Sequence, residues 1–102
     1  MINEKDLKSE FIVSKYVKPT DKFGVYIIEI VNAVIYSSTS FKYYHDIEEL
    51  KSRCYLFILL NFHKCDENKG GSIFSFLYTL ARQSILTSMR IVRNYKEDEL
   101  LE

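Results

Sequence analysis

Glycine and proline are scarce in this chain: three glycines and one proline stand among 102 residues. Tight turns between strands depend on these two residue types, so their scarcity argues against a sandwich or barrel and favours long helices. Cysteine is scarce too, and Cys54 and Cys65 are too few for a disulfide framework. We therefore expect two free thiols in a reducing compartment.

Long hydrophobic runs and a leader pattern are also missing. No apolar run approaches the roughly 20 residues that a membrane-spanning helix needs. Residues 1–10 are polar and charged, unlike a secretory signal peptide. The sequence thus predicts a cytoplasmic protein without a membrane partner.

The chain has no net charge, because 14 lysines and arginines balance 14 aspartates and glutamates. Overall charge therefore gives no sign of nucleic-acid binding, and such a sign has to come from local clusters. One cluster exists, since Lys69–Lys96 holds five basic residues and no acidic one. The residues after it are mostly acidic, which makes the C-terminal part of the chain electrostatically asymmetric.

The chain does contain enough apolar residues, 47% of the total, for a globular core in a single domain. Four segments have the length and spacing of helices: 4–17, 22–37, 46–63 and 72–94. The second is rich in β-branched residues, so a strand is a competing interpretation there. Its length and its lack of turn signals favour a buried helix.

Capping residues mark where these helices begin. Thr20 or Asp21 can cap the second and Ser72 the fourth, while Asp46 can cap the third with Glu49 in the capping-box position. We predict an all-α fold, a compact bundle of three to four helices. Its expected divisions are a polar helix or arm at 1–19, a helical domain at 20–95 and an acidic tail at 96–102.

The predicted third helix has two different faces. One face is the expected core side: Ile47, Leu50, Cys54, Ile58 and Asn61. The other is charged at its ends and apolar in its middle: Glu49, Arg53, Leu56, Phe57, Leu60 and Lys64. An exposed apolar patch rimmed by charge typically marks a protein partner. The alternative is that another helix of the domain covers this face.

The predicted fourth helix separates more cleanly into an apolar and a basic face. The apolar face consists of Ile73, Phe74, Leu77, Ala81, Ile85 and Val92. The opposite face carries Arg82, Arg90, Arg93 and Lys96, with Thr79 and Gln83 beside them and Phe76 at its edge. Cations along one face can follow a phosphate backbone, and an exposed ring can stack on unpaired bases. The simpler alternative is that these cations solvate the helix and favour its C-terminal end through the dipole.

Three short motifs stand in an order that is typical of one family. They are DIEEL at 46–50, DENKG at 66–70 and SIFSFLYTLARQ at 72–83. This order and spacing resemble region 2 of the sigma-70 family of transcription initiation factors, most of all its extracytoplasmic-function branch. Members typically read Asp-x-Glu-Asp-Leu, then Asp-x-x-Arg-Gly, then Ser-Phe-x-x-Trp-Leu-Tyr-x-Ile-Ala-Arg-Asn. The likeness covers roughly residues 20–95.

The resemblance implies two binding surfaces. The helix from residue 46 would dock on the clamp of the large RNA polymerase subunit through Glu49, Arg53, Leu56, Phe57 and Leu60. The helix from residue 72 would bind the non-template strand of a promoter −10 element. Its expected DNA-binding residues, with one from the preceding loop, are Lys69, Phe76, Thr79, Arg82, Gln83, Arg90, Arg93 and Lys96.

The chain also departs from the family pattern. Ser52-Arg53 stands where a Gln-Glu pair is common, and Phe76 replaces the motif tryptophan. This sequence holds no residues for the helix-turn-helix of region 4, so we expect a companion protein to supply that function, as in late sigma factors of phages or two-part bacterial sigma factors. The rival interpretation is a region-2 mimic that binds polymerase and inhibits or redirects host transcription. A third is a small helical protein with an accidental likeness.

No enzyme and no cofactor are expected. The sequence shows no nucleophile–base arrangement, and His45, His63, Cys54 and Cys65 match no zinc spacing. The 70–72 stretch Gly-Gly-Ser could present a helix N-terminus to an anion. A simple turn and cap is the preferred interpretation there.

Overall fold

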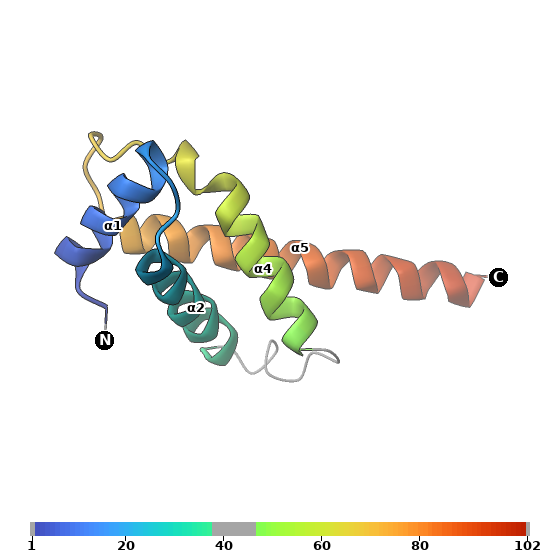
Figure 1. Cartoon of the computed structure of the whole chain (residues 1–102). Coiled ribbons are helices and arrows are strands. Elements are labelled where there is room, and N and C mark those ends of the chain that lie inside the picture. The colour runs from blue at the N-terminus through green and yellow to red at the C-terminus, as the bar shows by residue number, and fades with distance from the viewer. Residues whose placement is uncertain (1, 38–46, 102) are drawn as a thin grey trace.

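The computed structural model describes residues 2–37 and 47–101, with side chains described as far as Ser88. Over these residues the chain forms four α-helices and one 3-10 turn (Figure 1). They are α1 (Glu4–Tyr16), α2 (Asp21–Tyr36), α4 (Ile47–Asn61), the turn Phe62–Lys64 and α5 (Ile73–Leu101). The all-α prediction is confirmed. The expected connector at 37–45 lies outside the described residues except for Ser37, and so does the expected cap Asp46.

The first two helices are started by side chains that cap free backbone N–H groups. Asn3 Oδ1 accepts from the N–H groups of Lys5 and Asp6, at 3.0 and 3.2 Å. Thr20 Oγ1 accepts from the N–H of Phe23 at 3.1 Å, so Thr20 rather than Asp21 caps α2. The segment that could have been a strand is helical. The buried residues of α2 recur every three or four positions, which gives it one continuous apolar face.

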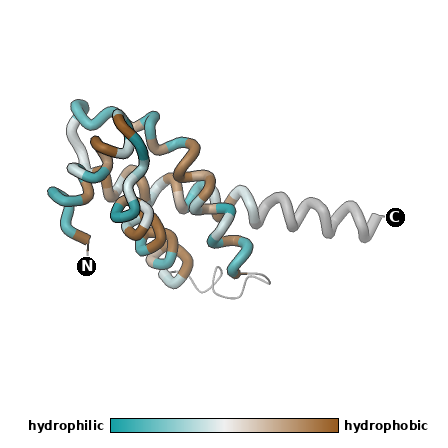
Figure 2. The backbone as a smooth tube through the Cα atoms, viewed as in Figure 1, coloured by the Kyte–Doolittle hydropathy of each residue, from teal (hydrophilic) through white to brown (hydrophobic). Residues whose placement is uncertain are grey.

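The core is apolar, and all four helices and the 3-10 turn contribute to it (Figure 2). Three aromatic rings pack together in this core. The ring centroids of Phe11 and Phe23 are 6.2 Å apart, and the ring centroid of Phe62 lies 5.8 Å from that of Phe11 and 4.9 Å from that of Phe23. Leu7 and Phe11 of α1 are fully buried. The polar N-terminal helix is therefore part of the core, and each fully buried large apolar side chain contributes roughly 1.5–3 kcal/mol.

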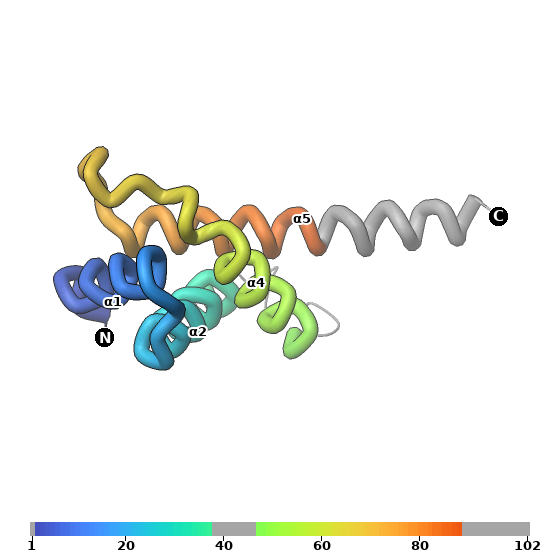
Figure 3. Tube along the Cα trace, turned by 45° about the horizontal axis from the view of Figure 1, so that its top comes forward, coloured from blue at the N-terminus to red at the C-terminus, as the bar shows by residue number. Residues whose placement is uncertain are grey.

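Helix α5 is the central element, because α1, α2 and α4 all pack against its first half (Figure 3). It also continues past the other helices, and the molecule measures 51 × 24 × 24 Å along its principal axes (Figure 1). The contact with α4 is close: Cys54 Sγ donates to the carbonyl of Ala81 at 3.5 Å. None of the helices in the described ranges is long and apolar enough to cross a bilayer.

Candidate functional site

The loop between α4 and α5 forms a pocket that contains two of the predicted DNA-binding residues. Its wall residues come from the 3-10 turn, the loop and the first turn of α5: Lys64, Asp66, Lys69, Gly71, Ser72 and Phe76 among others. Lys69 and Phe76 are seven positions apart in sequence, and the loop brings them to one concave surface. We call this the loop pocket.

Backbone geometry that only glycine adopts easily gives the loop its shape. Gly70 and Gly71 have φ angles of 78° and 89°, in the left-handed region. Just before them, Asp66 Oδ1 accepts from the N–H of Asn68 at 2.9 Å, and the Asp66 carbonyl accepts from the N–H of Lys69 at 3.3 Å. Two of the three glycines of the chain are therefore used to turn the backbone at this pocket.

The charge of the loop pocket is set by one ion pair. Glu67 lies against Lys15, whose Nζ is 2.9 Å from Glu67 Oε2, and the Tyr16 hydroxyl donates to Glu67 Oε1 at 2.5 Å. These two donors lower the pKa of Glu67 to about 2. Because Glu67 is neutralised by Lys15, the lysines 64 and 69 of the pocket wall face the single remaining carboxylate of Asp66.

The N-terminus of α5 already holds an anion from the chain itself. Glu4 of α1 accepts from the N–H groups of Ile73 and Phe74, at 2.7 and 3.4 Å, and Ser72 Oγ accepts from the N–H of Ser75 at 3.2 Å. The cap at Ser72 is confirmed. An external anion at this helix end would have to displace the Glu4 carboxylate, so the backbone N–H groups are not an open phosphate site.

Part of the predicted basic face of α5 can be placed. Thr79, Arg82 and Gln83 are exposed, and Thr79 Oγ1 donates back to the carbonyl of Ser75 at 2.9 Å. The expected exposure of Phe76 is wrong: its ring is half-buried against the core. The reason is that α1, α2 and α4 all pack on α5, so more of its circumference is buried than the single apolar face that the sequence predicts. The side chains of Arg90, Arg93, Lys96 and the expected core residue Val92 lie outside the described residues.

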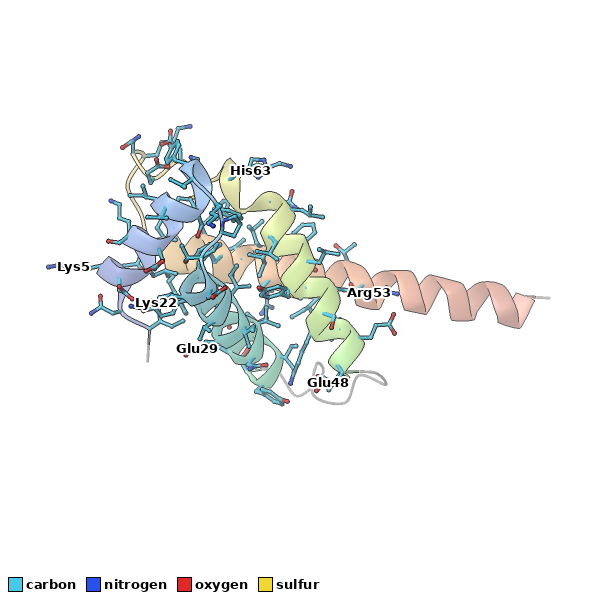
Figure 4. All side chains as sticks on the ribbon, in the orientation of Figure 1. Lys5, Lys22, Glu29, Glu48, Arg53 and His63 are labelled. Atoms are coloured by element: carbon cyan, nitrogen blue, oxygen red, sulfur yellow. The ribbon has the colours of Figure 1, made fainter. Side chains whose placement is uncertain are left out.

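The predicted partner face of α4 is open among the described residues. Leu56, Phe57 and Leu60 are 56%, 36% and 63% exposed. Arg53 Nη2 lies 2.7 Å from Glu49 Oε1, and Figure 4 shows Arg53 projecting from the helix. The interpretation that another helix covers these residues is therefore wrong for the described part of the chain. We call Glu49, Arg53, Leu56, Phe57 and Leu60 the α4 stripe.

The opposite, expected core face of α4 is mostly confirmed. Leu50, Cys54 and Ile58 are buried. Ile47 is half-buried, and so is Asn61, whose side-chain amide donates to the Phe57 carbonyl at 2.8 Å. The prediction that Asn61 belongs to the core face is therefore wrong, because its side-chain amide hydrogen-bonds to the backbone of its own helix at the edge of the core.

Sequence reasoning missed a groove between α2 and α4. Two adjoining hollows there share Ile28 and Tyr55, and Leu56 and Leu59 of α4 complete the apolar wall with Val25 of α2. Val25 and Ile28 are 53% and 50% exposed. The sequence signal for the groove was that Val25 and Ile28 are three positions apart, which places them on one side of α2 and outside its buried face. Leu56 belongs to both the groove and the α4 stripe, so the two form one apolar surface.

Comparisons with known protein families, with curated proteins and with solved structures find no match for this chain.

Proposed function

We propose that this protein is a sigma-factor-like subunit for transcription initiation. It binds the clamp of the large RNA polymerase subunit and the non-template strand of a promoter −10 element, with a companion protein supplying the region 4 function. The observation that carries the proposal is the loop pocket. It unites Lys69 and Phe76, the residues that the family resemblance assigns to DNA, at the start of the helix that carries Arg82 and Gln83.

The chemistry of the loop pocket suits an unpaired base on a phosphate chain. A half-buried ring is held in place by the core and needs little further ordering to accept a base. Base–aromatic stacking contributes about 1–3 kcal/mol per base, against a cost of a few kcal/mol for removing a base from the duplex. Lys64 and Lys69 of the pocket wall supply charge for the adjoining phosphates.

The partner surface supports the polymerase part of the proposal. The α4 stripe and the neighbouring groove form one exposed apolar area across two helices, and charged residues border it. Apolar grooves between helices accept amphipathic helices of a partner, and the clamp presents a helical coiled coil.

The polymerase part is tested by capture of bacterial RNA polymerase on immobilised protein. Phe57→Asp places a charge in the middle of the α4 stripe, and we expect it to abolish capture of the core enzyme. Val17→Asp makes the same change at an exposed valine of the N-terminal region and should capture as well as wild type. Absence of polymerase from the wild-type eluate would refute the proposal.

The DNA part is tested with a labelled −10 oligonucleotide whose non-template strand is unpaired. Arg82→Glu reverses a charge at an exposed position of α5, and we expect at least a fivefold loss of affinity for the polymerase–protein complex. Lys5→Glu makes the same reversal on α1 (Figure 4) and should bind normally.

The second candidate function, a region-2 mimic that blocks initiation, is favoured by Arg53. This arginine replaces an acidic family position, and its guanidinium is held by Glu49 in the stripe. The two functions differ in the same assay: an inhibitor captures polymerase through Phe57 but gives no Arg82-dependent binding to the −10 strand.

A further inference from the structure

Helix α1 contacts both ends of the loop that forms the loop pocket. At the first end, Lys15 Nζ donates to the Cys65 carbonyl at 2.8 Å and to Glu67 Oε2 at 2.9 Å. At the other end, the Glu4 carboxylate accepts from the N–H groups of Ile73 and Phe74. The two contacts are made by opposite ends of α1, so one helix connects the two ends of the loop.

The contact at Lys15 is shielded from water. The side chains of Lys15 and Glu67 are 17% and 8% exposed. The Lys15 amine also lies 5.2 Å from the ring centroid of Tyr16, and the Tyr16 hydroxyl donates a hydrogen bond to Oε1, the other carboxylate oxygen of Glu67. A charge-assisted contact of low exposure is stronger than an ordinary surface ion pair. It therefore fixes the backbone at Cys65 and the side chain of Glu67 together.

We propose that α1 holds the loop pocket in its binding shape and that Lys15 is the positioning residue for this purpose. Lys15 acts through the loop and does not itself line the pocket. That the pocket receives a nucleic-acid base rests on the proposed function. The role of α1 in shaping the pocket is independent of that function, so the two statements can be tested separately.

The attachment of α1 to the rest of the protein does not depend on Lys15. Leu7 and Phe11 are fully buried in the core. Asp6 pairs with Lys22 at 2.6 Å and accepts from the Tyr26 hydroxyl, and the Glu10 carboxylate accepts from the Thr20 hydroxyl at 2.7 Å. Loss of the Lys15 amine should therefore loosen the loop and leave α1 in place.

The experiment compares Lys15→Met with Lys8→Met, which makes the same change at an exposed position of α1. Amide hydrogen exchange is followed at Asn68 and Lys69, whose N–H groups bond to Asp66, and at Val31 in the buried part of α2. For Lys15→Met we expect about tenfold faster exchange in the loop and unchanged exchange at Val31. Lys8→Met should match wild type at all three amides.

The same variants, each in complex with RNA polymerase, are titrated with the labelled −10 oligonucleotide whose non-template strand is unpaired. If wild type binds it, we expect Lys15→Met to bind about fivefold more weakly and Lys8→Met to bind normally. Unchanged loop exchange in Lys15→Met, or equal binding despite a loosened loop, would overturn the role of α1. Failure of wild type to bind would instead remove the proposed DNA function, and the exchange rates would still decide whether α1 shapes the pocket.

Discussion

At the scale of single residues, Glu4 has an effect far from its own place in the sequence. It stands in the first turn of α1 and caps α5 through Ile73 and Phe74. We expect Glu4→Ala to lower the free energy of unfolding by about 1 kcal/mol, because two N–H groups lose their acceptor. Chemical denaturation measures this loss.

Glu4→Asp is the matched control for that measurement. It keeps the charge at the start of α1, where a carboxylate favours the helix dipole, but it is one methylene too short for α5. We expect Glu4→Asp to lose most of the stability that Glu4→Ala loses. Full recovery would show that the contribution of Glu4 lies within α1.

The two thiols give a second residue-scale prediction. Burial raises the pKa of Cys54 to about 12 and also raises the pKa of Cys65. Because the thiolate is the reactive form, we expect neither cysteine to react measurably with a disulfide reagent in the folded protein at neutral pH. Both should react at once in denaturant, and mass spectrometry distinguishes the two states. Rapid labelling of native protein at Cys54 would contradict its burial.

At the scale of elements, the two kinds of glycine should respond oppositely to alanine. Gly71 has a φ of 89° in the loop, where a side chain strains the backbone, so Gly71→Ala should cost about 1 kcal/mol. Gly24 lies inside α2, where alanine favours the helix by roughly 0.5–1 kcal/mol. A Cβ at Gly24 would approach the Tyr55 hydroxyl to 2.9 Å, but that atom is the movable end of a side chain. Gly24→Ala should therefore cost less than Gly71→Ala in urea unfolding.

Sequence reasoning found the elements because their signals are local. Thr20 and Ser72 act on N–H groups three residues away, and the buried residues of α2 recur with helical spacing. Contacts between elements carry no local signal. The cap from Glu4 to Ile73 spans 69 positions, and no periodicity predicts it.

The same limit applies to the candidate site. Helical spacing predicted which residues form the α4 stripe, since one helix presents both of its faces in its own sequence, but it left open whether another helix covers them; their exposure is seen only in the folded chain. The half-burial of Phe76 and the groove at Val25 and Ile28 depend on how many helices pack on α5 and on where α2 meets α4. Such facts are properties of the assembled bundle, and a single segment does not contain them.

At the scale of the whole molecule, acid should destabilise the fold through the ion pair of Glu67. Its pKa is lowered from 4.5 to about 2, with the Lys15 amine as the largest cause and the Tyr16 hydroxyl next. Because the folded pKa is the lower one, the stabilisation is complete above 4.5 and is lost as the pH falls through about 2. We expect the melting temperature of wild type to fall more steeply across this window than that of Glu67→Gln. Parallel curves would contradict the role of this ion pair.

The contacts of α1 with both ends of the loop also have a consequence for folding during translation. Helix α1 leaves the ribosome before the loop and α5, and the groups that its ends bind, from the Cys65 carbonyl to the N–H of Phe74, are synthesised 50 to 70 residues later. Until α5 has emerged, the apolar side chains of Leu7 and Phe11 have only part of their final surroundings. The nascent chain therefore exposes part of the apolar surface of α1 while these 50 to 70 residues are synthesised, and a chaperone that binds such surfaces can act in that interval.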